Sequence, residues 1–379
     1  MSTPSAPQSV VNGAPSGKTS NVTPRVRFHA IDDAEGIWRY SAGGYLPVAV
    51  GDRLGDRYQV VHKLGHGSYS TVCTADASPR ESEILSLLGK SPLDGTASHV
   101  VAGGKEMIPS VLDEFRVTGP HGTHTCLVTP PARSSVAQTR LSSFNRPFRL
   151  DVARAIAAQL ILAVSYIHSK GIVHGDLHLG NVLLKMPLDF ARLSDEELYE
   201  EWGGPELEPV TTFNGAPIPP GVPSHAVLPI NLITRCDELP LADAHIVVTD
   251  FGEAFFPARE SKTECSTPTH CRPPECRFEP LEPRSFPSDI WTLACSVWGI
   301  IGQRSLFEMI MSSEDDTTVL QVDALGKPPD NWWERWDARL DNFTEDGQPK
   351  NDRPDPISTL ESEFRARYRG GVESLEWRS

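Results

Sequence analysis

The side chains best suited to chemistry in this sequence lie in short polar segments between apolar ones. In the first segment, Asp176 is followed five residues later by Asn181, and both lie between the apolar stretches Ile172–His174 and Val182–Leu184. A carboxylate can orient a hydroxyl group and accept its proton, and a carboxamide oxygen can hold a divalent cation. An Asx turn in a solvated loop is the alternative use of these residue types.

Two further segments complete a set that could act on phosphates. Asp250 and Gly252 follow the apolar run Ile246–Thr249, which places a second acidic oxygen beside a flexible glycine, suited to Mg²⁺ that bridges phosphates. The turn at Gly65 and Gly67 lets backbone amides approach phosphate oxygens closely, because glycine has no side chain to keep them apart. A phosphate cradle, a proton acceptor and metal-holding oxygens are the parts that phosphoryl transfer requires.

The elements that must position these residues can be predicted from periodicity. Apolar residues at three- and four-residue spacings predict an amphipathic helix over 152–169, which ends at a basic residue and Gly171. A second, largely apolar helix is expected over 288–301, and the tryptophans at 332, 333 and 336 are expected to pack in a core. We also expect a hairpin from Tyr58–Leu64 and Thr71–Cys73, a short helix over Glu81–Leu88, a strand at Cys126–Val128, and short buried strands at Ile172–His174, Val182–Leu184 and Ile246–Thr249.

Composition narrows the class of protein. The chain has 379 residues, 39% of them hydrophobic, with no run of eighteen apolar residues and no signal-like start, so we expect an intracellular protein of the cytoplasm, the nucleus or both, without a membrane partner. A formal net charge of -15 argues against direct nucleic-acid binding and permits a basic protein partner. The seven cysteines form no CxxC pair, which favours free thiols.

With these motifs in order, the sequence resembles the eukaryotic protein kinases of the serine/threonine type. The loop around Asp176 resembles the kinase catalytic loop, and Asp250-Phe-Gly resembles its metal-binding motif. Arg272–Glu275 resembles the end of the activation segment, and Ser288–Cys295 resembles the large-lobe helix whose aspartate, here Asp289, anchors the catalytic loop. The resemblance implies an α+β, two-lobed kinase fold, ATP and Mg²⁺ as cofactors, Asp176 as catalytic base, and Asn181 and Asp250 as metal ligands.

A narrower resemblance, to the SR-protein kinase family, covers residues 37 to about 345. It rests on Gly43–Val48, Gly51-Asp52, Arg57-Tyr58 and Lys63–Val72, where serine replaces the third glycine of the loop. It implies a monomer that acts on a protein substrate, basic or rich in Arg-Ser segments, which suits the acidic balance of the chain. The nucleotide-binding residues that it implies in the small lobe are Leu64, Gly65, His66, Gly67, Ser68, Val72 and Glu83.

The resemblance also implies domain boundaries. Composition marks residues 1–31 as a disordered arm, with order expected to begin near Ile37, and marks a proline-rich insertion over 186–243 that wraps on the surface. The expected division is a small, mostly β, incomplete N-lobe over 32–131, a larger helical C-lobe over 132–370, and a tail over 371–379.

The sequence departs from the kinase pattern in two places. Kinases keep a third-strand lysine paired with the glutamate that Glu83 matches, yet no lysine lies between Lys63 and Lys90. Either the chain is a catalytically impaired binding module, or coding sequence was skipped near Cys73. His178 stands where these kinases have a lysine near the γ-phosphate, so it joins Asp176 as a candidate catalytic residue. The same loop pattern occurs in small-molecule kinases of the aminoglycoside and choline phosphotransferase type. A small-molecule kinase is therefore a further alternative for the function of the chain.

Overall fold

The protein combines small antiparallel sheets with a group of packed helices. The structure, a computed structural model, describes residues 26–66, 71–72, 79–90, 103–143, 147–187, 190–302, 304–307 and 313–350. Its strands are β1 (Arg53–Leu54), β2 (Tyr58–Gln59), β3 (Gly65–His66), β4 (Thr71–Val72), β5 (Asp113–Gly119), β6 (Gly122–Val128), β7 (Ala132–Ser135), β8 (Val182–Lys185), β9 (Leu207–Pro209), β10 (His225–Val227) and β11 (Ile246–Val248). Its helices are α1 (Pro79–Gly89), α3 (Val136–Leu141), α4 (Leu150–Ser169), α5 (Asp195–Trp202), α6 (Glu275–Phe278), α7 (Phe286–Gly302), α8 (Glu314–Leu325), α9 (Asp330–Trp333) and α10 (Arg339–Asn342).

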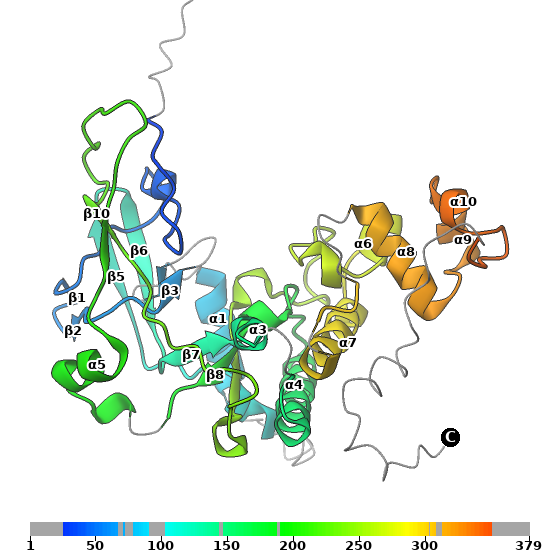
Figure 1. Cartoon of the computed structure of the whole chain (residues 1–379), viewed down its shortest axis with the longest axis horizontal. Coiled ribbons are helices and arrows are strands. Elements are labelled where there is room, and N and C mark those ends of the chain that lie inside the picture. The colour runs from blue at the N-terminus through cyan, green and yellow to red at the C-terminus, as the bar shows by residue number, and fades with distance from the viewer. Residues whose placement is uncertain are drawn as a thin grey trace, which may run out of the picture.

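Most of the strands and most of the helices lie on opposite sides of the molecule. Figure 1 shows β1, β2, β5, β6 and β10 on one side and α4, α6, α7 and α8 on the other, with α1, α3, β7 and β8 between them. The β5–β6 hairpin turns through Gly119 and Gly122, and β8 lies at the centre of the three-stranded antiparallel sheet β11-β8-β7. The turns that follow β11 and precede β8 carry the candidate chemistry, so this small sheet fixes their relative position.

The main core is built around α4. Its apolar positions, including Val152, Ile156, Leu160 and Ile167, are buried against α1, α7, β8 and β11. Burial of each such side chain stabilises the fold by about 1.5 to 3 kcal/mol. Gly171 closes the helix with a positive φ of 74° and donates its N–H to the carbonyl of His168. The helix predicted over 152–169 is therefore confirmed.

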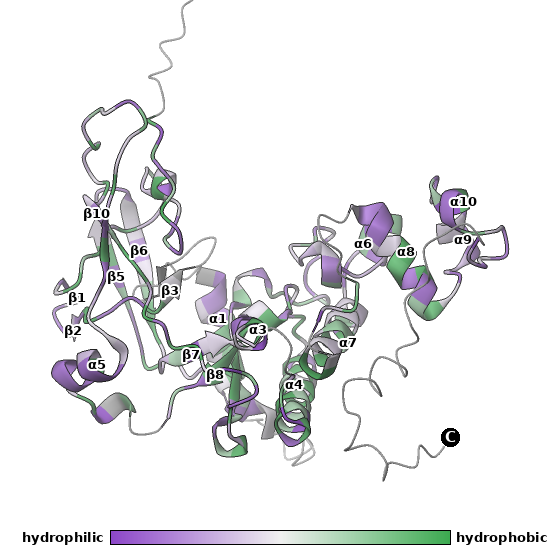
Figure 2. Cartoon of the chain, viewed as in Figure 1, coloured by the Kyte–Doolittle hydropathy of each residue, from purple (hydrophilic) through white to green (hydrophobic). Residues whose placement is uncertain are grey.

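Helix α4 is both long and apolar. Among the described residues it is the one helix long and apolar enough to cross a membrane by length and composition, and half of that window is buried inside the protein. Figure 2 shows apolar residues along α4 and α7, whereas α5 is largely hydrophilic. We read α4 as the central core helix, because residues on several of its faces contact other elements.

Most of the other predicted elements are present. The expected helices over 81–88 and 288–301 correspond to α1 and α7, and the expected strands at 126–128, 182–184 and 246–249 correspond to β6, β8 and β11. The predicted hairpin is wrong in its first strand: within Tyr58–Leu64 only β2 forms, and it pairs with β1, whereas β4 pairs with β3 at Gly65–His66. The strand expected at 172–174 is wrong, since that segment forms only a single bridge between Val173 and Phe255. Trp333 and Trp336 are buried with Phe278 and Phe343, and Trp332 packs against them, as expected.

The expected insertion over 186–243 is more than a surface covering. Val210 and Ala226, from the β9–β10 hairpin and its approach, are buried with Ile37, Tyr40 and Tyr45 of the N-terminal segment. Order also begins earlier than the expected position near Ile37, because Phe28 bridges Thr212 and the carbonyl of Arg27 accepts the N–H of Phe213. Pairing with a segment far along the chain orders these residues, and local composition does not reveal such pairing.

A buried ion pair joins the N-terminal segment to the residues before the glycine turn, and hydrogen bonds join both to the insertion. Lys63 contacts the carboxylate of Glu35, and the two side chains are only 3% and 5% exposed. Lys63 also donates to the carbonyl of Val227 at 2.9 Å, and the Ile230 N–H donates to the Lys63 carbonyl at 2.8 Å. The hydroxyl of Tyr40 donates to Glu35 as well. Three distant segments therefore meet at one lysine.

Candidate active site

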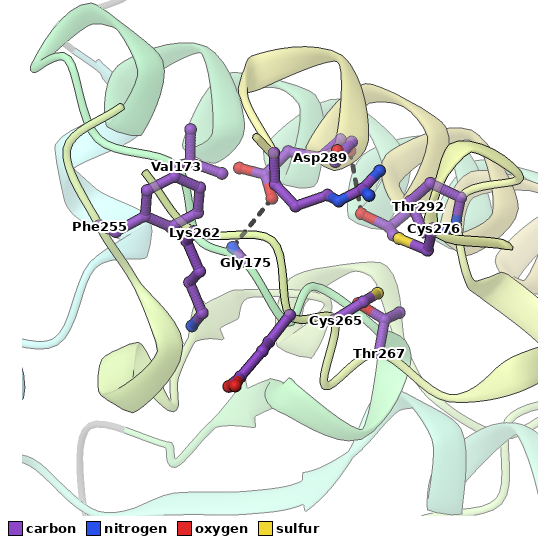
Figure 3. A pocket seen from close by; sticks show the side chains of 13 residues that line it. Val173, Gly175, Phe255, Lys262, Cys265, Thr267, Cys276, Asp289 and Thr292 are labelled. Atoms are coloured by element: carbon purple, nitrogen blue, oxygen red, sulfur yellow. Dashed lines mark hydrogen bonds between the residues drawn. The ribbon is translucent and has the colours of Figure 1, made fainter. Parts of the chain in front are cut away.

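The loop before β8 is held by a buried carboxylate on α7. Asp289 accepts the backbone N–H of His174 at 2.7 Å with one oxygen and that of Gly175 at 3.0 Å with the other. Figure 3 shows the bond from Gly175. The Nε2 of His168, near the end of α4, lies 2.9 Å from the first of these oxygens. Asp289 is only 2% exposed, so these hydrogen bonds are shielded from water. The predicted anchoring role of Asp289 is confirmed.

Glycine is required at position 175. Its φ is 79°, and a Cβ there would lie 2.7 Å from the carbonyl oxygen of Glu253. A side chain would thus meet both backbone strain and a backbone clash. The tight turn brings the segment that carries Asp176 against the segment that follows β11.

His174 makes the second link between these two segments. It is fully buried, its Nε2 lies 3.1 Å from the carbonyl of Thr249, and its ring lies 4.9 Å from that of Phe251. Burial lowers the pKa of His174, so the imidazole is neutral and donates this hydrogen bond as a fixed tautomer. The residue directly before Asp250 is therefore tied to the Asp176 loop.

Asp176 itself carries a carboxylate oxygen with no partner. Its Oδ1 is buried and makes no hydrogen bond among the described residues, although most buried polar atoms in proteins are paired. Burial, followed by the charges of Asp250 and Glu253, raises the pKa of Asp176 to about 7. Such a carboxylate is suited to accept a proton near neutral pH from a group that enters the site.

Asn181 completes this loop. Its side-chain Nδ2 donates to the backbone carbonyl of Asp176 at 2.9 Å. Its backbone carbonyl accepts the N–H of Thr249 at 2.8 Å. Since the amide nitrogen is engaged by the loop, its Oδ1 is the atom left to hold a cation.

His178 lies beside Asp176. Its Nδ1 accepts the N–H of Gly180 at 3.1 Å, so the ring proton sits on Nε2, which is 3.8 Å from Oδ2 of Asp176. Burial, followed by the charge of His174, lowers the pKa of His178 to about 4. At neutral pH the site therefore has an uncharged donor at this position.

Asp250 has an unusual backbone conformation. Its φ of 64° and ψ of 68° lie in the left-handed region, which is uncommon for residues other than glycine. Strain of this kind is concentrated at functional sites. Asp250 directly precedes the 3₁₀ turn Phe251–Glu253, and Phe251 is fully buried in the main core.

The glutamate of α1 that reaches this turn is Glu81. Its Oε1 accepts the Phe251 N–H at 3.3 Å, and burial, followed by the charge of Asp250, raises its pKa to about 7. Glu83, the residue matched by resemblance, is exposed. The sequence could have indicated that Glu81 points inward. Glu81 lies three, four and seven residues before the buried Ile84, Leu85 and Leu88, so it shares their face of the helix.

The predicted nucleotide-binding residues are only partly described. Gly65 and His66 pair with Val72 and Thr71 as strands β3 and β4. Gly67 and Ser68 lie outside the described residues, as does 73–78, where the missing lysine would be sought. Leu64 packs against a cluster formed by Leu198, Ile230 and Leu232. The structure thus brings together Asp176, His178, Asn181, Asp250 and Glu81, and it leaves the glycine turn's role as a prediction.

Within the described residues no cluster of three histidine, cysteine or acidic side chains could hold a metal without help from other groups. The carboxylate of Asp250 and the carboxamide of Asn181 nevertheless suit Mg²⁺, which keeps several waters and phosphate oxygens around one or two protein ligands. The donor set present fits a cation that arrives with a nucleotide.

Sequence comparison finds similarity to proteins that are named as kinases. No family model matches the chain. The chain is 34% identical over 170 residues to serine/threonine-protein kinase spk-1 of Caenorhabditis briggsae, which covers 39% of this chain and 14% of that protein. It is 27% identical over 319 residues to serine/threonine-protein kinase SRPK of Physarum polycephalum, covering 78% of this chain and 73% of that protein. With protein kinase dsk1 of Schizosaccharomyces pombe it shares 31% identity over 198 residues, covering 47% and 35% of the two chains.

The motif order and the Asp289 anchor match the pattern of eukaryotic protein kinases, and the sequence is similar to proteins named as serine/threonine-protein kinases. Among these kinases, the chain is similar to the SR-protein kinases. The matched region spans 14% of the spk-1 protein and 35% of dsk1, and nearly three quarters of the Physarum kinase.

Proposed function

We propose that this chain is a serine/threonine protein kinase that transfers the γ-phosphate of ATP to a hydroxyl of a protein substrate. The observation that carries the proposal is the buried, unpartnered Oδ1 of Asp176, whose pKa is raised to about 7, beside Asn181 and Asp250. Phosphoryl transfer depends on positioning and electrostatics, and this arrangement supplies both.

Each side chain has a distinct part in the proposal. Asp176 orients the substrate hydroxyl and accepts its proton, and His178 donates its Nε2 proton as a hydrogen bond to the transferred phosphoryl group. Asn181 and Asp250 hold Mg²⁺, which neutralises charge on the phosphates when bound. Leu64, Gly65, His66, Gly67, Ser68 and Val72 form the nucleotide-binding turn, with a glutamate of α1 behind it.

We also propose the two-lobed organisation. The strands over 32–131 would form a small lobe that closes over the nucleotide, and 132–370 would form the large lobe, with the tail over 371–379 outside both. The expected arm over 1–31 is shorter, because Phe28 and Ile31 pack with this small lobe. The segregation of strands and helices in Figure 1 supports this division. Contacts of 206–230 with the N-terminal segment support a role for the insertion in stabilising the small lobe.

The proposed substrate is a basic protein, rich in Arg-Ser segments. The formal net charge of -15 favours encounter with a cationic chain, and one similar protein is named SRSF protein kinase 3, from Mus musculus, at 29% identity over 160 residues. We propose a monomer that acts in the cytoplasm, the nucleus or both, without direct contact with nucleic acid or membrane.

A second candidate function is a kinase-fold protein that binds nucleotide or partner with impaired catalysis. One observation favours it: the sequence has no lysine between Lys63 and Lys90. In the described part of the chain, Lys63 is engaged by buried Glu35, so it does not replace the missing side chain.

Nucleotide binding is the first test of both candidates. We expect Mg-ATP to raise the Tm of the chain, and we expect Asp250→Ala to remove most of that rise because it removes a metal ligand. Equal thermal shifts for the chain and the Asp250→Ala variant would exclude the proposed metal site. Phosphotransfer then separates catalysis from binding alone.

A further inference from the structure

The segment that follows Asp250 carries a thiol that faces a second thiol on α6. Cys265 lies in that segment, and Cys276 lies in α6, directly after the motif that ends the segment. Both line a shallow hollow that opens to solvent and also borders Asp289 and Thr292. In Figure 3 the sulfur atoms of Cys265 and Cys276 point toward one another.

The two thiols differ in acidity. The interaction of Cys265 with the Cys276 thiol, supported by Thr267, lowers the pKa of Cys265. The same contact raises the pKa of Cys276. One partner is thus a nucleophilic thiolate and the other a nearby thiol that can resolve an intermediate.

The other described cysteines lack this combination. Cys271 is 3% exposed and Cys295 is 7% exposed, and burial raises the pKa of both. Cys126 and Cys236 are also buried. Cys265 and Cys276 are both partly exposed. Among the residues the structure describes, only this pair joins solvent access to a stabilised thiolate.

We propose that Cys265 and Cys276 are an oxidation site that closes to a disulfide with a small-molecule disulfide such as oxidised glutathione. The Cys265 thiolate attacks one sulfur of the oxidant, forms a mixed disulfide and releases one glutathione thiolate. Cys276 loses its proton to solvent and attacks Sγ of Cys265, which releases the second glutathione. The two cysteines lose two electrons, and the oxidant gains them.

The bond would tie the segment after Asp250 to α6. It would enclose residues 265–276, including Thr267 and Thr269. Closing such a loop restricts the chain between the bonded residues. The inference concerns thiol chemistry, so its test does not depend on whether the chain transfers phosphate.

The test uses the reduced full chain and its Cys271→Ser variant, incubated with oxidised glutathione at pH 7.5 and then blocked with an alkylating reagent. A protease that cleaves after glutamate cuts after Glu264 and Glu275, which separates Cys265 from Cys276. In the Cys271→Ser variant, a disulfide between the peptide starting at 265 and the peptide starting at 276 can join only these two cysteines. We expect this linked pair to be the main disulfide product, and it should disappear on reduction.

A matched variant separates the two steps. Cys276→Ser should leave Cys265 as a stable glutathione adduct, whereas Cys265→Ser should leave neither adduct nor cross-link. In the unmodified chain, Cys265 should react with a thiol reagent about tenfold faster than Cys271. The inference is overturned if no linked pair forms, if Cys265 pairs with Cys271 in the full chain, or if Cys265 reacts no faster than Cys271. Because one arm uses the unmodified chain, a folding defect in a variant does not decide the result.

Discussion

Asp289 on α7 holds the backbone N–H of Gly175 at 3.0 Å, although the two residues are 114 positions apart in the chain. The same carboxylate accepts the N–H of His174, and through these bonds α7 holds the loop that carries Asp176. This loop is therefore positioned by α7 as well as by the sheet β11-β8-β7.

We expect Asp289→Ala to lower the free energy of unfolding by about 3 kcal/mol, because it leaves two buried N–H groups without an acceptor and removes the partner of His168. Urea unfolding followed by circular dichroism measures the change. Ile290→Ala is the control, since Ile290 is on the same helix and 52% exposed, and it should cost less than about 1 kcal/mol. Equal losses for the two variants would contradict the anchoring role.

The raised pKa of Asp176 predicts a pH-dependent stability. Its folded pKa of about 7 lies above the unfolded value of 3.8, so the folded state binds the proton more tightly. The carboxylate therefore destabilises the fold progressively as pH rises from about 4 to 7, by up to about 4 kcal/mol and less where water enters the site. We expect Asp176→Asn to stabilise the chain about 1 to 3 kcal/mol more at pH 8 than at pH 5.

This prediction is measured by urea unfolding in a chelating buffer without divalent cations. Asp341→Asn, at an exposed aspartate, is the control and should show no such trend. A stabilisation by Asp176→Asn that is the same at both pH values would mean that Asp176 is not desolvated in the folded state.

Glu81 and Glu83 can be distinguished by paired substitutions. Glu81→Ala leaves the Phe251 N–H without its acceptor beside Asp250, and we expect it to weaken Mg-ATP binding by about threefold or more. Glu83→Ala, at an exposed position, should change the affinity by less than about twofold. Isothermal titration of both variants decides between them. A larger loss in Glu83→Ala would favour the assignment drawn from the kinase resemblance.

The Lys63 and Glu35 pair predicts a strong non-additivity. Lys63→Met leaves a buried carboxylate unpaired and should cost about 3 to 5 kcal/mol of folding free energy. Combining it with Glu35→Gln, which keeps an oxygen for Tyr40, should recover at least half of that loss. Thermal and urea unfolding of the two single variants and the double variant measure the coupling. Additive losses would show that the pair is not isolated from solvent.

Much of the arrangement around α4 and α7 could be predicted from sequence because its information is local. The 3.6-residue periodicity predicts α4, the largely apolar stretch predicts α7, and the polar loop between apolar segments identifies Asp176 and Asn181. The resemblance added Asp289, whose contacts with the loop span more than a hundred residues.

The rest depends on pairing between distant segments. Phe28 with Thr212, and Lys63 with Glu35 and Val227, could not be derived from local pattern, because nothing in either segment indicates its partner. Glu81 could have been found from the face it shares with Leu85. The Cys265 and Cys276 pair required the fold of the intervening segment.

The decisive measurement is the rate of γ-phosphate transfer from ATP to an Arg-Ser-rich peptide, compared between the chain and its Asp176→Ala variant. We expect slow but measurable transfer by the chain, slow because of the missing third-strand lysine, and a rate at least about 100-fold lower in the variant. Restoring a third strand with its lysine should raise the rate. Transfer that is equal in the two proteins, or absent from a chain that still binds Mg-ATP, would contradict the proposed kinase activity.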